Sequence, residues 1–213
     1  MQFESLIFDI DGTLWDSRAL VAEGYNIQLR AEGLQHLCVT AEDLKKLFGK
    51  TMTDIADILL ATVPQSERYD LLERCMEQEQ KILHNDPCHI GYPKVKETLQ
   101  ELAKKHRLFI VSNSQSGYPQ LCIEKMGLEG LIIDHLCFGD TGTPKGETIR
   151  RLMEKNGIEN AAYIGDTQGD LEASEDAGIP FIFCAFGFGD PDHYFAKIHQ
   201  FEDLLKLSAA SRR

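Results

Sequence analysis

Four short segments of the sequence combine acidic, hydroxyl or lysine side chains with the small residues of loops. They are Asp9-Ile10-Asp11-Gly12-Thr13, Ser112-Asn113-Ser114, the segment 139–146 with Lys145, and Gly165-Asp166-Thr167-Gln168-Gly169-Asp170. Two carboxylates only two residues apart, at Asp9 and Asp11, are costly to place together because like charges repel. The spacing therefore favours a bound cation or a catalytic task, although Asp-Gly is also common in ordinary turns.

The other three segments add groups that suit an anionic ligand. Ser112 and Asn113 offer hydrogen-bond donors, although Ser-Asn is also plain turn chemistry. Lys145 stands at the start of a predicted helix, where a positive charge is unfavourable for the helix dipole, and this favours an anion-facing role. Asp166 and Asp170 supply two further carboxylates.

Each of these segments follows a short apolar run that reads as a buried strand. Such runs are Ser5–Phe8, Leu108–Val111, Ile132–Phe138, Ala161–Ile164 and Phe181–Cys184. Helical patterns lie between the later ones, over Val95–Lys105, Leu121–Met126, Glu147–Lys155 and Leu171–Ala177. The alternation predicts an α/β fold with a doubly wound parallel sheet, covered by helices on both faces. Ligands of such sheets bind beyond the carboxyl ends of the strands, where the four segments lie.

An early stretch of the chain has a different texture and reads as wholly helical. Ser17, Thr40 and Ser66 are expected to cap three of its helices. The helical patterns run from Ser17 past Leu29, over Ala41–Leu47, over Met52–Ala61, and from Ser66 past Leu83. Asn85-Asp86-Pro87 ends the last of them. We therefore expect an α/β core domain from residues 1–15 and 86–213, and an inserted α-helical cap domain over 16–85.

The order of the motifs resembles that of the haloacid dehalogenase (HAD)-like hydrolase superfamily. D-x-D-G-T, then Ser112, then Lys145, then G-D-T-x-x-D each stand at the end of a predicted strand. More narrowly, the chain looks like the phosphoglycolate-phosphatase-like branch, which has a helical cap inserted after the first motif. The resemblance covers nearly the whole chain and extends to Leu14-Trp15-Asp16-Ser17 and to Ala185-Phe186-Gly187-Phe188-Gly189.

The resemblance implies a role for each motif residue. Asp9 would attack phosphorus and form an aspartyl-phosphate, and Asp11 would serve as general acid and then general base. Mg²⁺ is the implied cofactor, held by Asp9, the backbone carbonyl of Asp11, and Asp166. The implied phosphate-binding residues are Gly12, Thr13, Ser112, Asn113 and Lys145. Asp170 would position Lys145 or a metal-bound water, and the presence of Asp11 favours phosphoryl transfer over dehalogenation.

The expected function is a phosphatase, a phosphoric monoester hydrolase acting on a small phosphorylated metabolite, with phosphoglycolate the first substrate to try. A phosphomutase or phosphotransferase on the same scaffold, and a catalytically silent binding module, remain alternatives. Trp15, Lys50 and Thr51 are candidate cap contacts. Gly49-Lys50-Thr51 also resembles the end of a Walker A loop, but Leu44 stands at the position of its first glycine, and a helix precedes it.

Composition limits the partners and the compartment. The 213 residues carry a formal net charge of −12, which disfavours nucleic-acid or membrane-surface binding. The sequence has neither a signal-peptide pattern nor an apolar run long enough to span a bilayer, so we expect a cytoplasmic protein, either monomer or homodimer. The cysteines show no C-x-x-C pair and are expected to be reduced and mostly buried. They are Cys38, Cys75, Cys88, Cys122, Cys137 and Cys184.

Overall fold

The computed structural model describes residues 3–87 and 90–209, and the chain divides into two compact units. The first unit contains Met1–Asp16 and Ile90–Arg213, and the second contains Ser17–His89. The boundaries expected from the sequence, after residues 15 and 85, lie within a few residues of these limits. The role of the second unit as a cap stays a prediction.

A single parallel sheet forms the centre of the first unit. Over the described residues it has six strands in the order β3-β2-β1-β4-β5-β6. The strands are β1 (Ser5–Phe8), β2 (Arg107–Ser112), β3 (Ile132–Cys137), β4 (Ala161–Gly165), β5 (Phe181–Cys184) and β6 (Ala196–Ile198). Phe8 at the end of β1 pairs with Ile110 of β2 and with Ile164 of β4. The loop that follows β1 therefore begins between the ends of its two neighbours.

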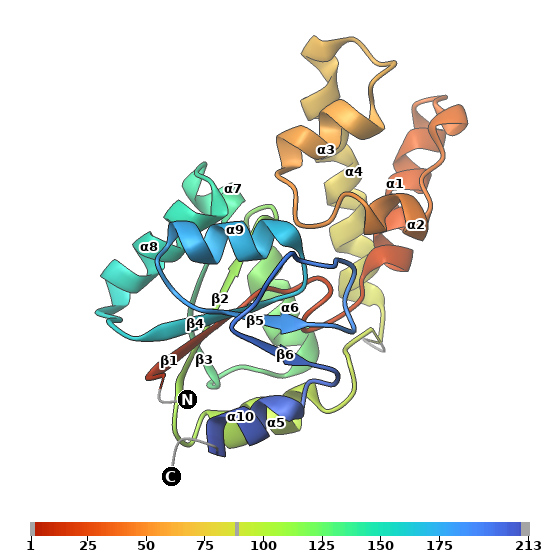
Figure 1. The fold of residues 1–213 in the computed structure, drawn as a ribbon. Coiled ribbons are helices and arrows are strands. Elements are labelled where there is room, and N and C mark those ends of the chain that lie inside the picture. Colours follow the sequence, from red (N-terminus) through yellow and green to blue (C-terminus); the bar gives the residue numbers. More distant parts are fainter. Residues whose placement is uncertain (1–2, 88–89, 210–213) are drawn as a thin grey trace. The chain divides into compact units, whose positions relative to one another are not determined.

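Helices cover both faces of this sheet, which confirms the predicted doubly wound architecture. They are α5 (Val95–Leu102), α6 (Tyr118–Met126), α7 (Phe138–Thr141), α8 (Lys145–Asn156), α9 (Gln168–Asp176) and α10 (Asp203–Ala209). Figure 1 shows α8 and α9 on one side of the sheet and α5 and α10 on the other. Because side chains alternate along a strand, Ile7 and Tyr163 pack with Ile149 of α8 on one face. On the other face Phe8 contacts Phe201, with ring centroids 5.9 Å apart.

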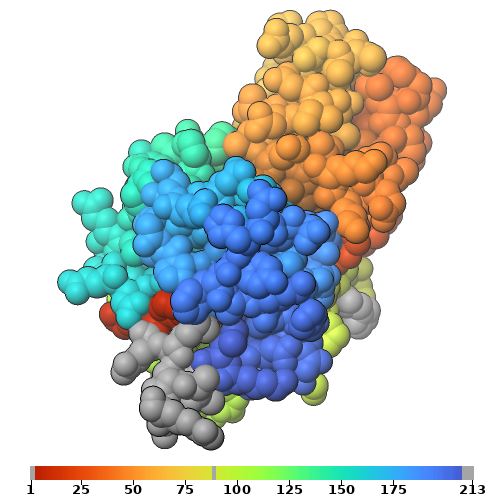
Figure 2. Space-filling model, viewed as in Figure 1, coloured from red at the N-terminus to blue at the C-terminus, as the bar shows by residue number. Residues whose placement is uncertain are grey.

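The central strand β1 is shielded from solvent. All four residues of β1 are buried, and in the space-filling view little of the red β1 is visible beside the blue surface of later segments (Figure 2).

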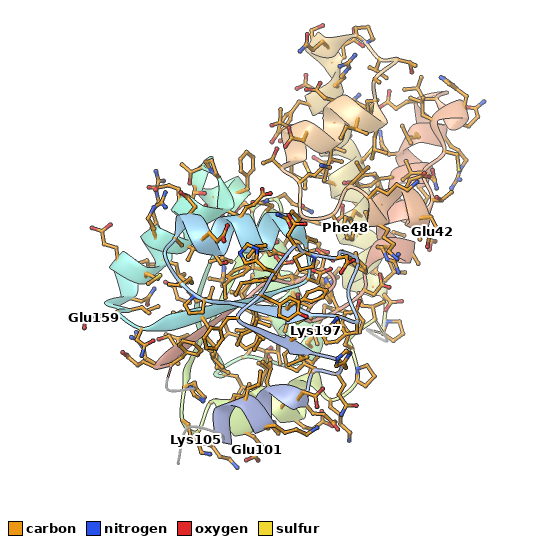
Figure 3. All side chains as sticks on the ribbon, in the orientation of Figure 1. Glu42, Phe48, Glu101, Lys105, Glu159 and Lys197 are labelled. Carbon is orange, nitrogen blue, oxygen red and sulfur yellow. The ribbon has the colours of Figure 1, made fainter. Side chains whose placement is uncertain are left out.

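Lys197, labelled in Figure 3, lies on the edge strand β6. Its Nζ is 5.4 Å from the ring centroid of Phe183 and 5.8 Å from that of Tyr194. A lysine at this position discourages pairing with another strand.

In the described part of the second unit, the regular elements are all helices. Its elements are α1 (Arg18–Ala31), the 3₁₀ helix η1 (Gln35–Leu37), α2 (Ala41–Lys45), α3 (Met52–Leu59) and α4 (Gln65–Asn85). Helices α1 and α4 approach closely at Gly24, where an added Cβ would lie 2.6 Å from the Cα of Glu79. Phe48, labelled in Figure 3, is partly buried against the apolar core of this unit. Thr40 caps α2 and, with Asp43, forms a capping box.

Several local expectations differ from the structure. The expected cap at Ser66 is wrong, because α4 begins at Gln65 after Pro64, which stands in the cap position. Ser17 precedes α1 but its side chain makes no capping hydrogen bond. The sequence indicated five strands, and β6 adds a sixth in the described chain. Phe138 begins α7 instead of ending β3, because the chain turns into a short helix capped at Cys137.

None of the helices in the described residues combines the length and apolar character needed to cross a membrane. The cysteines of this part of the chain are free, with Cys38 exposed and Cys75, Cys122, Cys137 and Cys184 buried. Cys88 lies outside the described residues.

Candidate active site

The candidate site lies at the carboxyl ends of the central strands of the first unit. Asp9 follows β1 directly, and its backbone N–H donates to the carbonyl of Ile164 over 2.8 Å. Ser112 is the last residue of β2, and Asp166 follows β4 directly. Because the three strands are adjacent and parallel, their ends bring these residues to one edge of the sheet.

Lys145 joins two of the carboxylates. Its Nζ lies 2.9 Å from Asp9 Oδ1 and 2.6 Å from Asp170 Oδ1. All three side chains are at most 4% exposed, so both ion pairs lie out of water. Burial alone would lower the pKa of Lys145, but the charges of Asp170 and Asp9 outweigh it and raise that pKa above its ordinary value. The ammonium is therefore charged and is shared between Asp9 and Asp170.

Asp170 holds the loop after β4 as well as Lys145. Its Oδ2 accepts hydrogen bonds from the backbone N–H of Asp166 and from the N–H and hydroxyl of Thr167, at 3.1, 3.0 and 2.8 Å. Thr167 in turn caps α9, so the two residues form a capping box. Burial raises the pKa of Asp170, but the charge and hydrogen bond of Lys145 act against it, and the net pKa is lowered. Asp170 is thus an ionised carboxylate with both oxygens engaged.

Asp166 is fully buried and only partly satisfied. Its Oδ2 accepts a hydrogen bond of 2.6 Å from the backbone N–H of Phe188, whereas Oδ1 has no hydrogen-bond partner among the described residues. A Cβ on Gly12 or Gly187 would collide with the Asp166 side chain, and Gly12 also has a φ of +85°. Glycine is therefore required at Gly12 on two grounds. Burial, followed by the charges of Asp170 and Asp9, raises the pKa of Asp166 well above its ordinary value.

These residues fit a divalent cation. One carboxylate oxygen each from Asp9, Asp166 and Asp170 lies within 4.8 Å of the others. Burial is the main reason why the pKa of Asp9 is raised to about 7. The charge of Lys145 opposes this shift, and the negative charge of Asp170 adds to it. Among the described residues, three buried carboxylates face one lysine here, so Lys145 can balance the charge of only one of them. Since Asp170 is engaged with Lys145 and the α9 cap, Asp9 and Asp166 are the carboxylates best able to hold a hard, oxygen-seeking ion.

Asp11 is half-buried and is held by aromatic donors. Its Oδ1 accepts hydrogen bonds of 2.9 Å from the Trp15 indole N–H and of 2.9 Å from the Tyr118 hydroxyl. The structure thus brings Trp15 to Asp11. Because the Trp15 side chain is completely buried, this contact is favoured over a direct contact between Trp15 and substrate.

The phosphate-binding candidates other than Lys145 lie at the carboxyl end of β2 and in the loops that follow β1 and β2. Thr13 is buried and its N–H donates to the carbonyl of Ile10 over 3.2 Å. Ser112 is 5% exposed, and its Oγ accepts a hydrogen bond of 3.3 Å from the N–H of Ser114. Asn113 is half-buried in the same loop. Contact of any of them with a phosphate stays a prediction.

The two remaining candidates lie in the second unit. Lys50 is exposed, and Thr51 caps α3, with its hydroxyl donating to Asp54 Oδ2 over 2.7 Å. The segment Gly49–Thr51 lies between α2 and α3 and follows a helix, whereas a Walker A loop follows a strand.

Two tyrosines near the site were not expected from the sequence. Tyr118 contacts Asp11, and Tyr163 on β4 donates to the carbonyl of Val111 over 2.8 Å and lies 3.5 Å from Asp9 Oδ1. Burial raises the pKa of Tyr163 well above its ordinary value, so its hydroxyl stays protonated. One signal for Tyr163 was available: it shares a sheet face with Ile7 on the neighbouring strand, which leads to Asp9 two residues later.

Comparison with known proteins agrees with this geometry. A family model described as haloacid dehalogenase-like hydrolase matches residues 6–184. A phosphoglycolate phosphatase from Agrobacterium fabrum is 30% identical over 194 residues, covering 86% of this chain and 81% of that protein. A pyrophosphatase, PpaX, from Oceanobacillus iheyensis is 23% identical over 198 residues, covering 91% and 88%. The structure of a haloacid dehalogenase-like family hydrolase from Streptococcus pneumoniae aligns with a TM-score of 0.81 at 18% identity, over 97% of this chain and 99% of that chain.

Proposed function

The chain belongs to the haloacid dehalogenase-like hydrolase family and is a phosphatase, and we propose that it hydrolyses a small phosphomonoester through a phosphoaspartyl intermediate on Asp9. The observation that carries this proposal is the buried Lys145, with Nζ 2.9 Å from Asp9 and 2.6 Å from Asp170. A fixed positive charge beside a buried carboxylate suits a nucleophile that must approach an anionic phosphoryl group.

In the first half-reaction Asp9 attacks phosphorus, and the bond from phosphorus to the ester oxygen breaks. Asp11 gives its proton to that oxygen, so the alcohol leaves neutral. Lys145 offsets negative charge on Asp9 and on the phosphoryl oxygens as they approach. The other phosphoryl oxygens would be bound at the ends of β1 and β2, by Gly12, Thr13, Ser112 and Asn113.

In the second half-reaction water attacks the phosphorus of the phosphoaspartyl group. Asp11, now ionised, takes a proton from that water, and the bond between phosphorus and Asp9 breaks to release inorganic phosphate. Mg²⁺, when bound, would neutralise charge between Asp9 and the phosphoryl group. Asp9, the backbone carbonyl of Asp11, and Asp166 would hold it. Asp170 would keep Lys145 and the loop after β4 in place.

The names of the relatives favour small substrates. One relative is a phosphoglycolate phosphatase and another a pyrophosphatase, so phosphoglycolate and pyrophosphate are the first two compounds to compare. Lys50 and Thr51 remain candidate contacts from the second unit, whereas Trp15 belongs to the first unit and is buried against Asp11. We also propose that the enzyme is cytoplasmic and is either a monomer or a homodimer.

The test is a measurement of inorganic phosphate released from a panel of phosphorylated metabolites, with phosphoglycolate and pyrophosphate included, in the presence of Mg²⁺. Asp9→Asn should abolish release from every substrate that the wild type accepts, while circular dichroism shows an unchanged fold. Products should be analysed as well as phosphate, because a rearranged sugar phosphate without free phosphate would indicate a phosphomutase. Phosphate release by Asp9→Asn at more than a few percent of wild type, with deamidation excluded, would refute Asp9 as the nucleophile.

A further inference from the structure

Asp11 receives two hydrogen bonds on the same oxygen from aromatic side chains. The Trp15 indole N–H and the Tyr118 hydroxyl each donate to Asp11 Oδ1 over 2.9 Å. The sp² oxygen of a carboxyl group has two lone pairs, and these two donors use both. The roles assigned above to Asp9, Lys145 and Asp170 do not explain this arrangement.

Both donors are rigidly placed. Trp15 is completely buried and Tyr118 is 2% exposed, and their rings meet edge to face with centroids 5.6 Å apart. The carbonyl of Trp15 accepts the N–H of Gly12 over 2.9 Å, and Trp15 also forms β-bridges with Asp11 and Gly91. Tyr118 begins α6, so a different part of the chain supplies the second donor. Aromatic side chains with buried polar ends locate a partner accurately because few rotamers remain open to them.

We infer that Trp15 and Tyr118 are positioning residues, which fix the Asp11 carboxyl group so that its Oδ2 exchanges the proton with the leaving oxygen. This inference rests on the proposed function. Because Oδ1 accepts both aromatic donors, the acid form of Asp11 carries its proton on Oδ2. The proton passes from Oδ2 to the ester oxygen as its bond to phosphorus breaks, and in the second half-reaction Oδ2 accepts a proton from water.

The two hydrogen bonds to Asp11 also have a purely structural use, because they satisfy the buried polar atoms of Trp15 and Tyr118. The positioning role and the structural role predict different effects for different leaving groups. An alkoxide must be protonated as it leaves, whereas the leaving group of acetyl phosphate is acetate, the weak base of a carboxylic acid, which leaves without a proton. A residue that positions the acid matters for the first kind of substrate, and a residue that maintains the fold matters equally for both.

The experiment compares kcat/KM for acetyl phosphate with that for the best alkyl phosphate of the panel, since kcat/KM covers every step through departure of the leaving group. Tyr118→Phe removes only the hydroxyl. We expect it to lower kcat/KM roughly tenfold for the alkyl ester, a part of the about 10²–10⁴-fold that general-acid catalysis contributes, and to change it little for acetyl phosphate. Tyr194→Phe, which removes the hydroxyl of an exposed ring, is the matched control.

A double-mutant cycle with Asp11→Asn gives a second measure. If Tyr118 acts through Asp11, Tyr118→Phe should cause no further selective loss once Asp11 is an asparagine. Trp15→Phe, which removes the other donor, should show the same leaving-group pattern and repeats the test if Tyr118→Phe does not fold. Equal losses on both substrates, or full additivity in the cycle, would overturn the inference while leaving the phosphatase assignment intact. Failure of the wild type to release phosphate from any ester would reject the proposed function and the inference with it.

Trp15 is the only tryptophan of the sequence, which gives a readout independent of turnover. Replacing the carboxylate beside its indole, in Asp11→Asn, should change the intrinsic fluorescence of the folded protein. Asp57→Asn, which removes an exposed carboxylate of the second unit, should not. Identical emission from the wild type and Asp11→Asn would mean that the indole does not contact Asp11 in solution, and this result would also overturn the inference.

Discussion

Lys145 shows how much depends on a single buried charge. Two carboxylates share its ammonium, and all three groups lie out of water. Breaking a buried ion pair by removing one partner typically costs about 3–5 kcal/mol, because the other charge is left uncompensated. Asp9 and Asp170 would both be left in that state. The lysine is therefore important for the stability of the site as well as for its chemistry.

Lys145→Ala should lower kcat by roughly 10²-fold or more, in line with the loss of a preorganised charge contact. If the lysine served only to hold the substrate phosphate, KM would rise and kcat would stay nearly constant. Steady-state kinetics on the best substrate separate the two cases. Lys145→Arg should restore little, because a planar guanidinium cannot replace a compact ammonium.

Lys155→Ala is the matched control, since Lys155 lies on the same helix but is exposed and pairs with Asp134. It should leave both kinetic constants unchanged. An unaltered kcat for a folded Lys145→Ala enzyme would remove Lys145 from the reacting site.

At the scale of the element, the first turn of α9 links helix capping to the site. Asp170 caps the helix with Thr167 through one oxygen and holds Lys145 through the other. A capping box of the same kind, between Thr40 and Asp43, begins α2 in the second unit. The capping box of Thr167 and Asp170 is thus part of the candidate site, whereas the capping box of Thr40 and Asp43 lies in the second unit.

Thr167→Ala should cost about 1 kcal/mol of stability, the usual value for loss of an N-cap side chain. It should also lower kcat by roughly tenfold, because a small displacement of a catalytic group is enough to cost up to about 10²-fold. Thr40→Ala should cause a similar loss of stability with no change in kcat. Chemical denaturation and steady-state kinetics of the two variants test this, and equal kcat values would show that the α9 cap does not control the position of Lys145.

Much of the α/β core was predictable because its strands are continuous apolar runs that each end in a polar motif. Asp9, Ser112 and Asp166 follow such runs, and the rule for parallel sheets brings their ends together. The short elements were not predictable: β6 has three residues and α7 has four, too few for a periodic pattern. The contact between Tyr118 and Asp11 spans 107 positions, and nothing in the local sequence separates Tyr118 from an ordinary core aromatic.

For the whole molecule, the charge imbalance at the site predicts a dependence of stability on metal. Mg²⁺ at about 100 times its Kd should stabilise the folded protein by about 2.7 kcal/mol, or raise the thermal midpoint by roughly 5–10 °C for a chain of this size. Excess chelator should remove both this shift and the activity. Thermal unfolding followed by circular dichroism measures the effect without turnover.

Asp166→Asn should lose most of the Mg²⁺-dependent shift, because it removes a proposed ligand. Asp57→Asn removes an exposed carboxylate and should keep the shift. A wild-type midpoint that does not respond to Mg²⁺ would contradict the metal assignment.

The two places where the chain leaves and re-enters the first unit are tied together within that unit. The N–H of Asp16 donates to the carbonyl of Ile90 over 2.8 Å, and the N–H of Tyr92 donates to the carbonyl of Leu14 over 3.0 Å. For the folding of the first unit, everything between these residues is a single loop whose ends are already joined, and the entropy cost of a closed loop grows only slowly with its length. The insertion point can therefore accept segments of very different length at little cost to the sheet. A chain built this way can exchange its entire second unit while Asp9, Lys145 and Asp166 stay where the sheet and α8 hold them.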